Sequence, residues 1–327
     1  MTTLTLSRAL NEGLRKAMED DPKVLIMGED VGKLGGVFRV TDGLQKDFGE
    51  ARVVDTPLAE SGIVGTAIGL ALRGYRPVCE IQFDGFVYPA FNQIVAQLAK
   101  MRMRSLGQVS LPVVIRIPCG GGIGAVEHHS ESPEALFAHM AGLRVVACGD
   151  PVDAFVMIQQ SISSNDPVIF FEPKRRYWDK ADVDTAGGVA ASIPLSRART
   201  LVDGTDVTVL AYGPMVRTCA EAAVAAAADG RSLEVIDLRS LSPLDTETIF
   251  ASVRRTGRCV VVHEAAISGG LGAEIAARVT EECFYHLEAP VLRVCGYSTP
   301  YPPSRIEEHY LPELDRVLDG VDRAFAY

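Results

Sequence analysis

Short apolar segments alternate with longer segments of helical periodicity along most of this chain, and no other feature restricts its fold as strongly. Residues 4–18, 61–72 and 219–228 carry apolar or small residues at the spacing of one helix face. The short segments between such helices suit strands of a parallel sheet that is buried on both faces, so we predict an α/β protein with mainly parallel sheets covered by helices. The predicted strands are residues 24–27, 52–55, 77–81, 112–116, 144–147, 168–171, 207–210, 233–236, 259–262 and 291–294.

The chain is predicted to fold as two domains. Its 327 residues suit two domains of roughly 150 residues each. Between residues 172 and 199 the alternation gives way to a charged stretch with alanine and glycine, which is typical of a connection. We place the first domain at 1–175, a linker at 176–199 and the second domain at 200–327.

Charge and hydropathy exclude several classes of partner. The chain carries 32 lysines and arginines against 42 aspartates and glutamates, a net charge of −10, so its overall field does not attract nucleic acid or an anionic membrane. No apolar run approaches the ~18 residues of a membrane span, and residues 1–6 lack the layout of a signal peptide. Seven widely spaced cysteines without a C-x-x-C pair indicate neither a zinc site nor a disulfide framework. We expect a cytoplasmic protein without a membrane or nucleic-acid partner.

One carboxylate, Glu60, lies at the mouth of an otherwise apolar helix predicted over residues 61–72. Pro57 ends the preceding strand, so Glu60 falls in the first helical turn, where the helix dipole favours negative charge. Helix capping and a functional role both account for the residue at this point.

The helix 61–72 itself contains Gly62, Gly65 and Gly69. Each glycine costs a helix roughly 1 kcal/mol against alanine, so three of them need a reason. Small residues at this spacing let a second helix approach closely. We predict a tight helix contact here, between subunits.

His128 and His129 follow the glycine-rich segment 120–124. Glycines let the backbone lie against a ligand, and a histidine beside them can move protons near neutral pH. An ordinary surface loop remains an alternative. Residues 80–86 end a strand at the edge where open α/β sheets bind ligands, although their aromatic side chains also suit a core.

Other polar or glycine-rich segments favour ordinary structural roles. Residues 268–272 lack the full G-x-G-x-x-G spacing with a downstream acid, so a dinucleotide site is not indicated. The pair His263 and Glu264 is interpreted as a polar strand end, because no second histidine follows at metal-binding spacing. The pair Arg175 and Arg176 is interpreted as part of a solvated face.

Motifs spread in order over nearly the whole chain resemble one family, the beta subunits of thiamine-diphosphate-dependent 2-oxoacid dehydrogenases. They are residues 28–31, 56–65, 80–83, 129–134, 170–174, 237–245 and 296–302. Within that family, three features look closer to the branched-chain enzyme than to the pyruvate enzyme: residues 38–41, residues 93–95 together with 101–104, and residues 295–297. The implied fold is a transketolase-like pyrimidine-binding domain followed by a transketolase-like carboxy-terminal domain.

The resemblance implies roles for five residues. Glu60 would hydrogen-bond the pyrimidine ring nitrogen of thiamine diphosphate and so activate the coenzyme. Phe86 would stack on the aminopyrimidine, with Leu58 and Gln82 lining the same pocket. His129 would face the reacting carbon and assist proton transfer or docking of the lipoyl group. Phe86 stands where branched-chain relatives carry tyrosine, so stacking is kept and a hydroxyl hydrogen bond is lost.

The resemblance also implies half of an active site. The chain lacks the Gly-Asp-Gly motif that holds the diphosphate and its magnesium in this superfamily, so an alpha subunit would supply both in an alpha2-beta2 heterotetramer. A potassium site is implied as well, with Asp166 in place of the asparagine of relatives. Its ligands would be the carbonyl groups of Leu111, Val113, Val114, Ser161 and Ser164 and the side chain of Asp166.

The predicted function is oxidative decarboxylation of branched-chain 2-oxo acids, with acyl transfer to a lipoyl-lysine. The second domain would pair subunits and bind the subunit-binding domain of the acyltransferase core, a basic partner that suits the negative charge. A pyruvate or acetoin enzyme is the nearest alternative. A noncatalytic scaffold and a free-standing nicotinamide dehydrogenase are the others.

Overall fold

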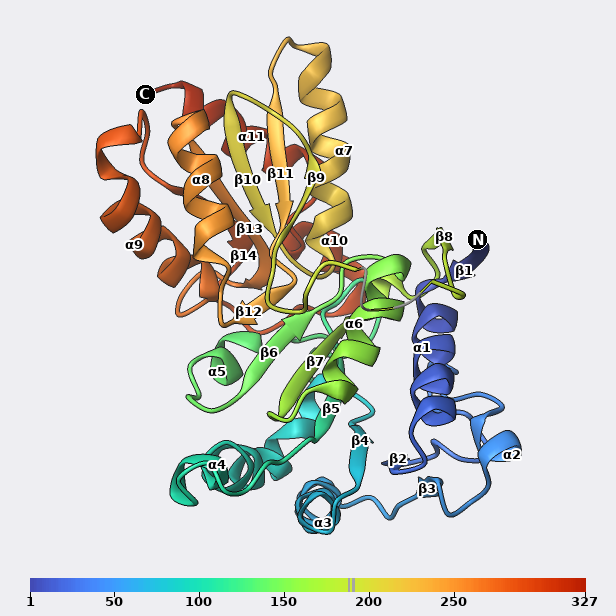
Figure 1. The fold of residues 1–327 in the computed structure, drawn as a ribbon. Helices are drawn as coiled ribbons and strands as arrows, with labels where there is room; N and C mark the ends of the chain where they lie inside the picture. The colour runs from blue at the N-terminus through green and yellow to red at the C-terminus, as the bar shows by residue number, and fades with distance from the viewer. Residues whose placement is uncertain (188, 190–191) are drawn as a thin grey trace.

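The computed structural model describes residues 1–187, 189 and 192–327, which form two layered α/β units (Figure 1). The first unit contains β1 (Thr2–Thr5), α1 (Leu6–Asp20), β2 (Val24–Gly28), α2 (Leu44–Phe48), β3 (Val53–Asp55), α3 (Glu60–Leu72), β4 (Arg76–Glu80), η1 (Asp84–Ala90), η2 (Gln93–Leu98), α4 (Met101–Arg104), β5 (Val114–Cys119), η3 (Glu127–His129), α5 (Glu134–Ala138), β6 (Arg144–Ala147), α6 (Pro151–Ser163), β7 (Val168–Pro173), η4 (Lys174–Arg176) and β8 (Lys180–Val183).

The second unit contains β9 (Arg199–Val202), β10 (Val207–Ala211), α7 (Met215–Ala228), β11 (Leu233–Asp237), β12 (Ser240–Ser242), α8 (Thr246–Thr256), β13 (Cys259–Ala266), α9 (Leu271–Cys283), η6 (Phe284–His286), β14 (Leu292–Gly296), η7 (Ser304–Ile306), α10 (Glu307–Tyr310) and α11 (Leu314–Phe325). All ten predicted strands are present, so the periodicity of the sequence identified the architecture correctly.

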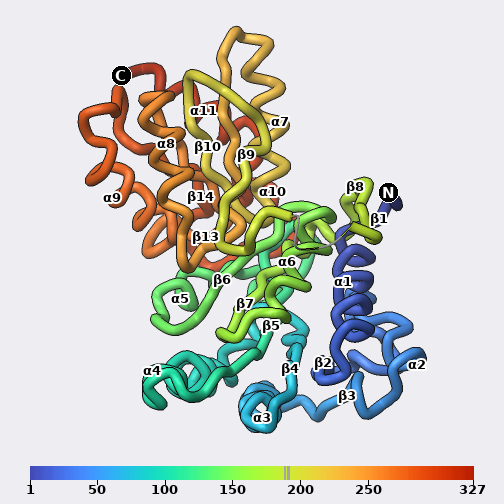
Figure 2. Tube along the Cα trace, in the orientation of Figure 1, coloured from blue at the N-terminus to red at the C-terminus, as the bar shows by residue number. Residues whose placement is uncertain are grey.

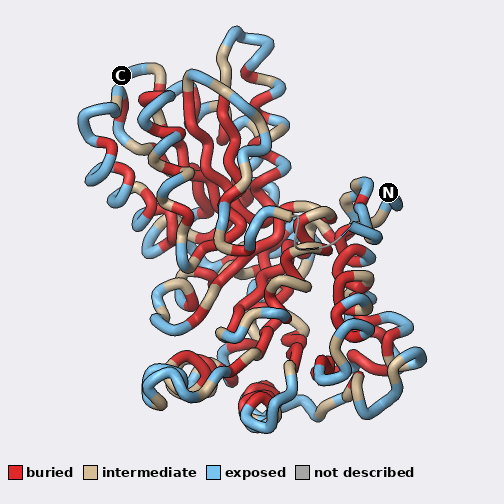
Figure 3. Tube along the Cα trace, viewed as in Figure 1, coloured by how far each residue is buried: buried red, intermediate tan, exposed pale blue. Residues whose placement is uncertain are grey.

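Each unit is built on a mainly parallel sheet. The seven-stranded sheet has the order β12-β6-β7-β5-β4-β2-β3, and the five-stranded sheet has the order β14-β13-β10-β11-β9. Only β12 in the first sheet and β9 in the second pair antiparallel to a neighbour. The central strands of both sheets are buried and helices cover them, whereas the edge strands β3 and β9 are partly exposed (Figure 3). The predicted α/β fold is confirmed.

Two short strands cross the predicted domain limits. Strand β12 belongs to the second half of the chain, yet it pairs with β6 and so completes the seven-stranded sheet of the first unit. Strand β8 lies inside the segment predicted as a linker and pairs with β1 next to the amino terminus (Figure 2). Residues 188, 190 and 191 of that segment lie outside the described residues. Neither strand carries the apolar run by which the other strands were predicted, because β12 reads Ser-Leu-Ser and β8 reads Lys-Ala-Asp-Val.

Two arginines that follow β7 form hydrogen bonds with residues of the second unit. The side chain of Arg176 donates from Nε to the carbonyl oxygen of Pro214 at 3.0 Å and from Nη2 to the hydroxyl of Thr218 at 2.9 Å. Arg175 reaches Glu313 at 2.8 Å. The interpretation of Arg175 and Arg176 as a solvated face is therefore wrong. Burial against the second unit, which sequence periodicity does not show, explains the difference.

The segment 89–104 does not form one regular helix in the structure. The chain there forms η1, with Pro89 inside it, then the π-helical turn η2, and finally the single α-helical turn α4. Proline removes a backbone donor and clashes with the preceding turn, so a regular helix is not favoured at this point.

Among the described residues, no helix combines the length and apolarity that crossing a membrane requires.

His263 is a fully buried residue of β13. One ring nitrogen lies 3.0 Å from the carbonyl oxygen of Ala265, and the other accepts the N–H of Gly272 at 3.2 Å. Burial lowers the pKa of His263 to about 4, because the charged imidazolium would lose its hydration. The side chain is thus a neutral structural residue, as expected for a polar strand end.

The lowered pKa of His263 predicts a loss of stability in acid. The unfolded chain takes up this proton near its ordinary pKa of 6.5, whereas the folded chain resists it down to about 4. The stabilisation is complete above pH 6.5 and falls by up to about 3 kcal/mol as pH approaches 4. Urea unfolding between pH 7 and pH 4.5 measures it, with His263→Gln as the comparison. The wild-type minus variant difference should fall with pH; a constant difference would contradict the assignment.

Candidate active site at the carboxyl edge of the seven-stranded sheet

Three parallel strands bring the candidate residues to one edge. Gly28 at the end of β2 pairs with Asp55 of β3 on one side and with Glu80 of β4 on the other. The loops that leave these strands therefore start side by side. They lead to Glu29, to Glu60 and to residues 81–86, at the carboxyl edge where open α/β sheets bind ligands.

Glu60 is the first residue of α3 and is only 8% exposed. The preceding residue, Ala59, provides no side-chain cap, so the dipole of the helix N-terminus acts on Glu60 itself. Burial and the nearby charge of Glu60 raise the pKa of Glu29. One carboxyl oxygen of Glu29, Oε1, is buried without a hydrogen-bond partner. The two carboxyl groups thus share a poorly solvated place, in which it is the pKa of Glu29 that is raised.

An aromatic cluster forms the second part of the site. The ring of His129 stacks on Phe83 with centroids 4.0 Å apart and meets the ring of Phe86 edge-on at 5.1 Å. Gly85 permits this approach, since a Cβ atom there would lie 2.1 Å from the carbonyl oxygen of His128. The structure therefore brings together the predicted residues Phe86 and His129, which are far apart in the sequence.

A buried ion pair contacts the backbone of His129. The ammonium group of Lys174 bonds the Asp84 carboxylate and also donates to the carbonyl oxygen of His129. Asp84 in turn accepts the backbone N–H of Glu131 at 2.8 Å. Burial lowers the pKa of the His129 imidazole, so the ring is neutral at pH 7 and able to accept a proton. The sequence analysis did not assign Asp84 or Lys174 to the site, although both lie in the segments it singled out.

The remaining predicted residues, Gln82 and Leu58, lie at the solvent-exposed edge of the candidate site. Gln82 is partly exposed, and its amide nitrogen is 3.4 Å from Asp30. Leu58 lies in the loop before α3 and is 74% exposed. Helix α3 packs against η1, which carries Phe86. Glu60 and Phe86 thus lie on adjoining elements and Gln82 lies just before η1, while the apolar side chain of Leu58 is largely exposed.

A second buried ion cluster lies under the site. Arg116 on β5 is fully buried and bonds Glu80 at 2.6 Å and Glu172 at 2.6 and 2.9 Å. The hydroxyl of Tyr177 donates to Glu172 at 2.6 Å. This cluster joins the carboxyl halves of β4, β5 and β7. Sequence reasoning missed it, because a charge inside an apolar segment resembles the end of a strand.

The residues predicted to bind potassium gather around the start of β5 and the end of α6. Both carboxylate oxygens of Asp166 face guanidinium groups, from Arg102 on one side and from Arg144 at 3.4 Å on the other. The carbonyl oxygen of Ser164 accepts from Arg76 at 3.1 Å. In this arrangement the carboxylate does not fit a cation unless both arginines move away. The potassium site stays a prediction, and no role is derived from it.

The predicted coenzyme site can be tested against the same geometry. A flat ring with hydrogen-bond donors suits this site. The buried carboxylate at the helix start and the nearby amide can bond the edge of such a ring, and the partly exposed aromatic side chain can stack on its face. Glu60, Phe86 and Gln82 therefore fit the pyrimidine end of thiamine diphosphate. No cluster of three or more metal-binding side chains occurs among the described residues.

Comparisons with known proteins identify the family of this chain. The family model "Transketolase, pyrimidine binding domain" matches residues 2–179, and "Transketolase, C-terminal domain" matches residues 196–317. The chain is 61% identical to a protein named pyruvate dehydrogenase E1 component subunit beta from Leifsonia xyli, over 99% of this chain and 96% of that one. It is 55% identical to 3-methyl-2-oxobutanoate dehydrogenase subunit beta from Mycobacterium tuberculosis, over 98% of this chain and 92% of that one.

A solved structure supports the fold alone. The protein described as a split gene transketolase, an inactive beta4 tetramer, superimposes with a TM-score of 0.81 at 24% identity. The match covers 99% of this chain and 98% of that chain. The predicted transketolase-like architecture of both units is thereby confirmed.

Proposed function

This chain belongs to the family of beta subunits of 2-oxoacid dehydrogenases, and we propose from that premise that it forms half of a thiamine-diphosphate-dependent active site. The observation that carries the proposal is the buried carboxylate of Glu60 beside Glu29, at the same sheet edge as Phe86 and His129. Because the chain has no Gly-Asp-Gly motif, an alpha subunit would hold the diphosphate and Mg²⁺.

Each residue then has a defined task. Thiamine diphosphate, when bound, supplies the reactive carbon and the electron sink for decarboxylation of a 2-oxo acid. Glu60 would bond the pyrimidine ring nitrogen and keep a proton there, helped by the low solvation it shares with Glu29. Phe86 would offer its ring face. His129, neutral at pH 7, would give or take a proton near the reacting carbon or the lipoyl group.

We propose a branched-chain 2-oxo acid as the substrate. The segments 38–41, 93–95 together with 101–104, and 295–297 and the relative named 3-methyl-2-oxobutanoate dehydrogenase support this choice. Pyruvate is the second candidate, because a relative with 61% identity is named for it. A pocket that is shaped for an isopropyl group gains roughly 10–200-fold for each carbon it buries.

Turnover by the co-expressed alpha and beta chains decides between the two substrates. The ratio kcat/KM should favour 3-methyl-2-oxobutanoate over pyruvate by at least about tenfold. A preference for pyruvate would establish the second candidate. An assembled complex that decarboxylates neither acid, nor acetoin in the corresponding reaction, would favour a noncatalytic scaffold.

Helix α3 offers a contact surface for a partner chain. Its glycines face away from the core, and a Cβ atom added at Gly65 or Gly69 would have no neighbour within 4 Å. Ile63, Val64 and Ala67 pack inward on the opposite face. Such an unfilled glycine face, adjoining Glu60, suits close packing of a helix from an alpha subunit.

Filling the glycine face should abolish assembly without harming the chain. Gly65→Leu places its side chain in open space and removes a poor helix former, so the unfolding temperature of the beta chain should stay equal or rise. Co-purification with the alpha chain should be lost. Ala227→Leu adds the same bulk on the exposed surface of α7 and should assemble normally. Normal assembly of Gly65→Leu would exclude α3 as the interface.

The remaining parts of the assembly are proposed on the same basis. The complex would be an alpha2-beta2 heterotetramer in the cytoplasm that passes acyl groups to the lipoyl-lysine of an acyltransferase core. The core would bind through its subunit-binding domain to the second unit of this chain, and the net charge of −10 suits a basic docking surface.

A further inference from the structure

The glycine-rich loop of residues 120–126 connects β5 to η3 and so leads directly to His129. Gly120, Gly122 and Gly124 have φ angles of 82°, 81° and 71°, a region that favours glycine. The loop therefore contains few side chains that could anchor it. Its conformation depends on what binds its backbone.

The second unit binds that backbone. Glu307 on α10 accepts the N–H of Gly124 at 2.9 Å with one carboxylate oxygen and the N–H of Gly122 at 3.2 Å with the other. The hydroxyl of Tyr301 donates to Glu307 at 2.9 Å, while a carboxylate oxygen of Glu264 accepts the N–H of Gly121. Glu307 thus receives three donors at once.

Tyr301 also fixes the loop by contact. A Cβ atom at Gly121 would lie 1.7 Å from the Tyr301 hydroxyl oxygen, so the loop is pressed against this ring. Burial and the bond to Glu307 raise the pKa of Tyr301, so its hydroxyl stays protonated at neutral pH and continues to donate.

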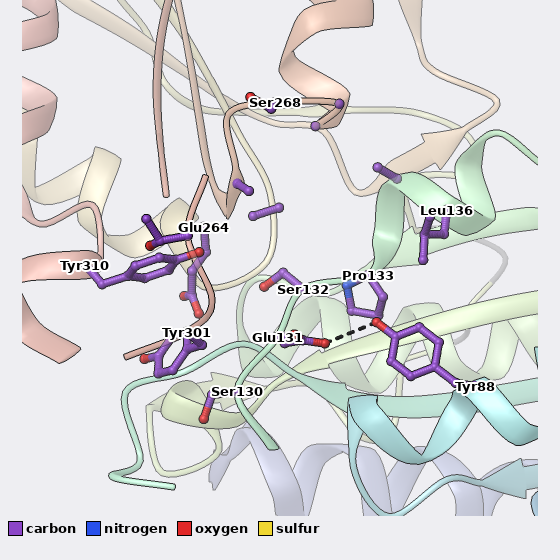
Figure 4. A pocket seen from close by; sticks show the side chains of 16 residues that line it. Tyr88, Ser130, Glu131, Ser132, Pro133, Leu136, Glu264, Ser268, Tyr301 and Tyr310 are labelled. Carbon is purple, nitrogen blue, oxygen red and sulfur yellow. Dashed lines mark hydrogen bonds between the residues drawn. The ribbon is translucent and has the colours of Figure 1, made fainter. Parts of the chain in front are cut away.

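A cavity of about 270 Å³ adjoins this contact. Ser130 and Glu131 line one side, and Glu264, Tyr301 and Tyr310 line the other (Figure 4). Since this space is open, the segment after His129, which continues from the loop, has room to move if the bonds to Glu307 are removed.

The loop transmits its position to His129 through Val126. The carbonyl oxygen of Val126 accepts the backbone N–H of His129 and the hydroxyl of Ser130, each at 3.0 Å. A displacement of residues 122–126 therefore shifts the backbone of His129 relative to Phe83 and Phe86.

We propose that Glu307, supported by Tyr301, is a positioning residue for His129 that acts across the junction of the two units. The proposal rests on the proposed function for its effect on turnover. Its structural part, the retention of the glycine loop by Glu307, does not depend on that function.

Glu307→Ala in the assembled alpha–beta complex tests both parts. Hydrogen exchange of the amides at residues 121–126 should speed up by about tenfold, because the N–H of Gly124 loses its acceptor and the N–H of Gly122 keeps only the bond to the Tyr301 hydroxyl at 3.3 Å. Tyr301→Phe should give a smaller increase. Glu308→Gln changes the neighbouring, exposed carboxylate of α10 and should leave exchange unchanged. Unchanged exchange in Glu307→Ala would overturn the proposal outright.

Turnover tests the link to His129. In Glu307→Ala, kcat should fall by about tenfold with KM within about twofold, since an effect confined to stability would leave the kcat of the folded fraction unchanged. Combined with His129→Gln, the change at 307 should cause little further loss, because it acts through that histidine. Additive losses, or normal kcat despite faster exchange, would overturn the positioning role. If the wild-type complex lacked decarboxylase activity, the proposed function would fail while the exchange test still decided the loop contact.

Discussion

Decarboxylation by the assembled complex is expected to fall by about 10²–10⁴-fold when Glu60 is replaced by glutamine. The amide keeps the size of the side chain and its place at the start of α3, yet it cannot hold a proton on the pyrimidine nitrogen of a bound coenzyme. The buried surroundings that Glu60 shares with Glu29 make the carboxylate effective there, because water does not screen it.

The measurement is kcat for a 2-oxo acid with an artificial electron acceptor, so that no acyltransferase core is needed. Glu50→Gln, which changes an exposed carboxylate, is the matched control and should retain full activity. Co-purification with the alpha chain should be normal for both variants. Wild-type turnover by Glu60→Gln would remove the central role assigned to this residue and favour the scaffold alternative.

Periodicity predicted the regular elements of this fold well. The strand expected at 24–27 is Val24–Gly28, and the helix expected at 61–72 is Glu60–Leu72. These elements are buried on defined faces, so their residues carry the period of the structure. Strand β12 could not be found in the same way, because its sequence Ser-Leu-Ser contains no apolar run and its partner β6 lies almost a hundred positions earlier.

Residues of the candidate site that belong to recognisable motifs could be predicted from the sequence. Residues that join the site only through tertiary contacts could not. Glu60, Phe86 and His129 were identified through the resemblance, and the structure places Phe86 against His129. The bond from Lys174 to Asp84 joins residues 90 positions apart. From the sequence alone, a charged residue such as Asp84 or Lys174 is expected to lie at the solvent-exposed surface. Only the structure shows that both side chains are buried.

The contacts of Glu307 could not be predicted from the sequence either. A glutamate on the single-turn helix α10 has no sequence feature that distinguishes it from its neighbour Glu308. Its function in the fold follows from the glycines it meets, which lie more than 180 positions earlier. Residues that hold a loop from another unit are therefore recognisable only from the structure.

The largest loss of stability is expected from Arg116→Met, at about 3–5 kcal/mol. Arg116 is fully buried between Glu80 and Glu172, which are themselves 5% and 0% exposed. Methionine fills much of the volume but leaves two carboxylates without a counter-charge in the interior. Burial already raises the pKa of Glu80, so the variant should recover part of its deficit as pH falls and Glu80 takes up a proton.

Urea unfolding at pH 7 measures this loss, and two comparisons show its origin. Arg8→Ala breaks an exposed pair with Glu12 and should cost no more than about 1 kcal/mol. The triple variant Glu80→Gln, Arg116→Met, Glu172→Gln removes all three charges and should be more stable than Arg116→Met alone, because buried unpaired charge, rather than lost attraction, causes most of the deficit. If the triple variant were the less stable of the two, packing of the arginine side chain would be the main contribution instead.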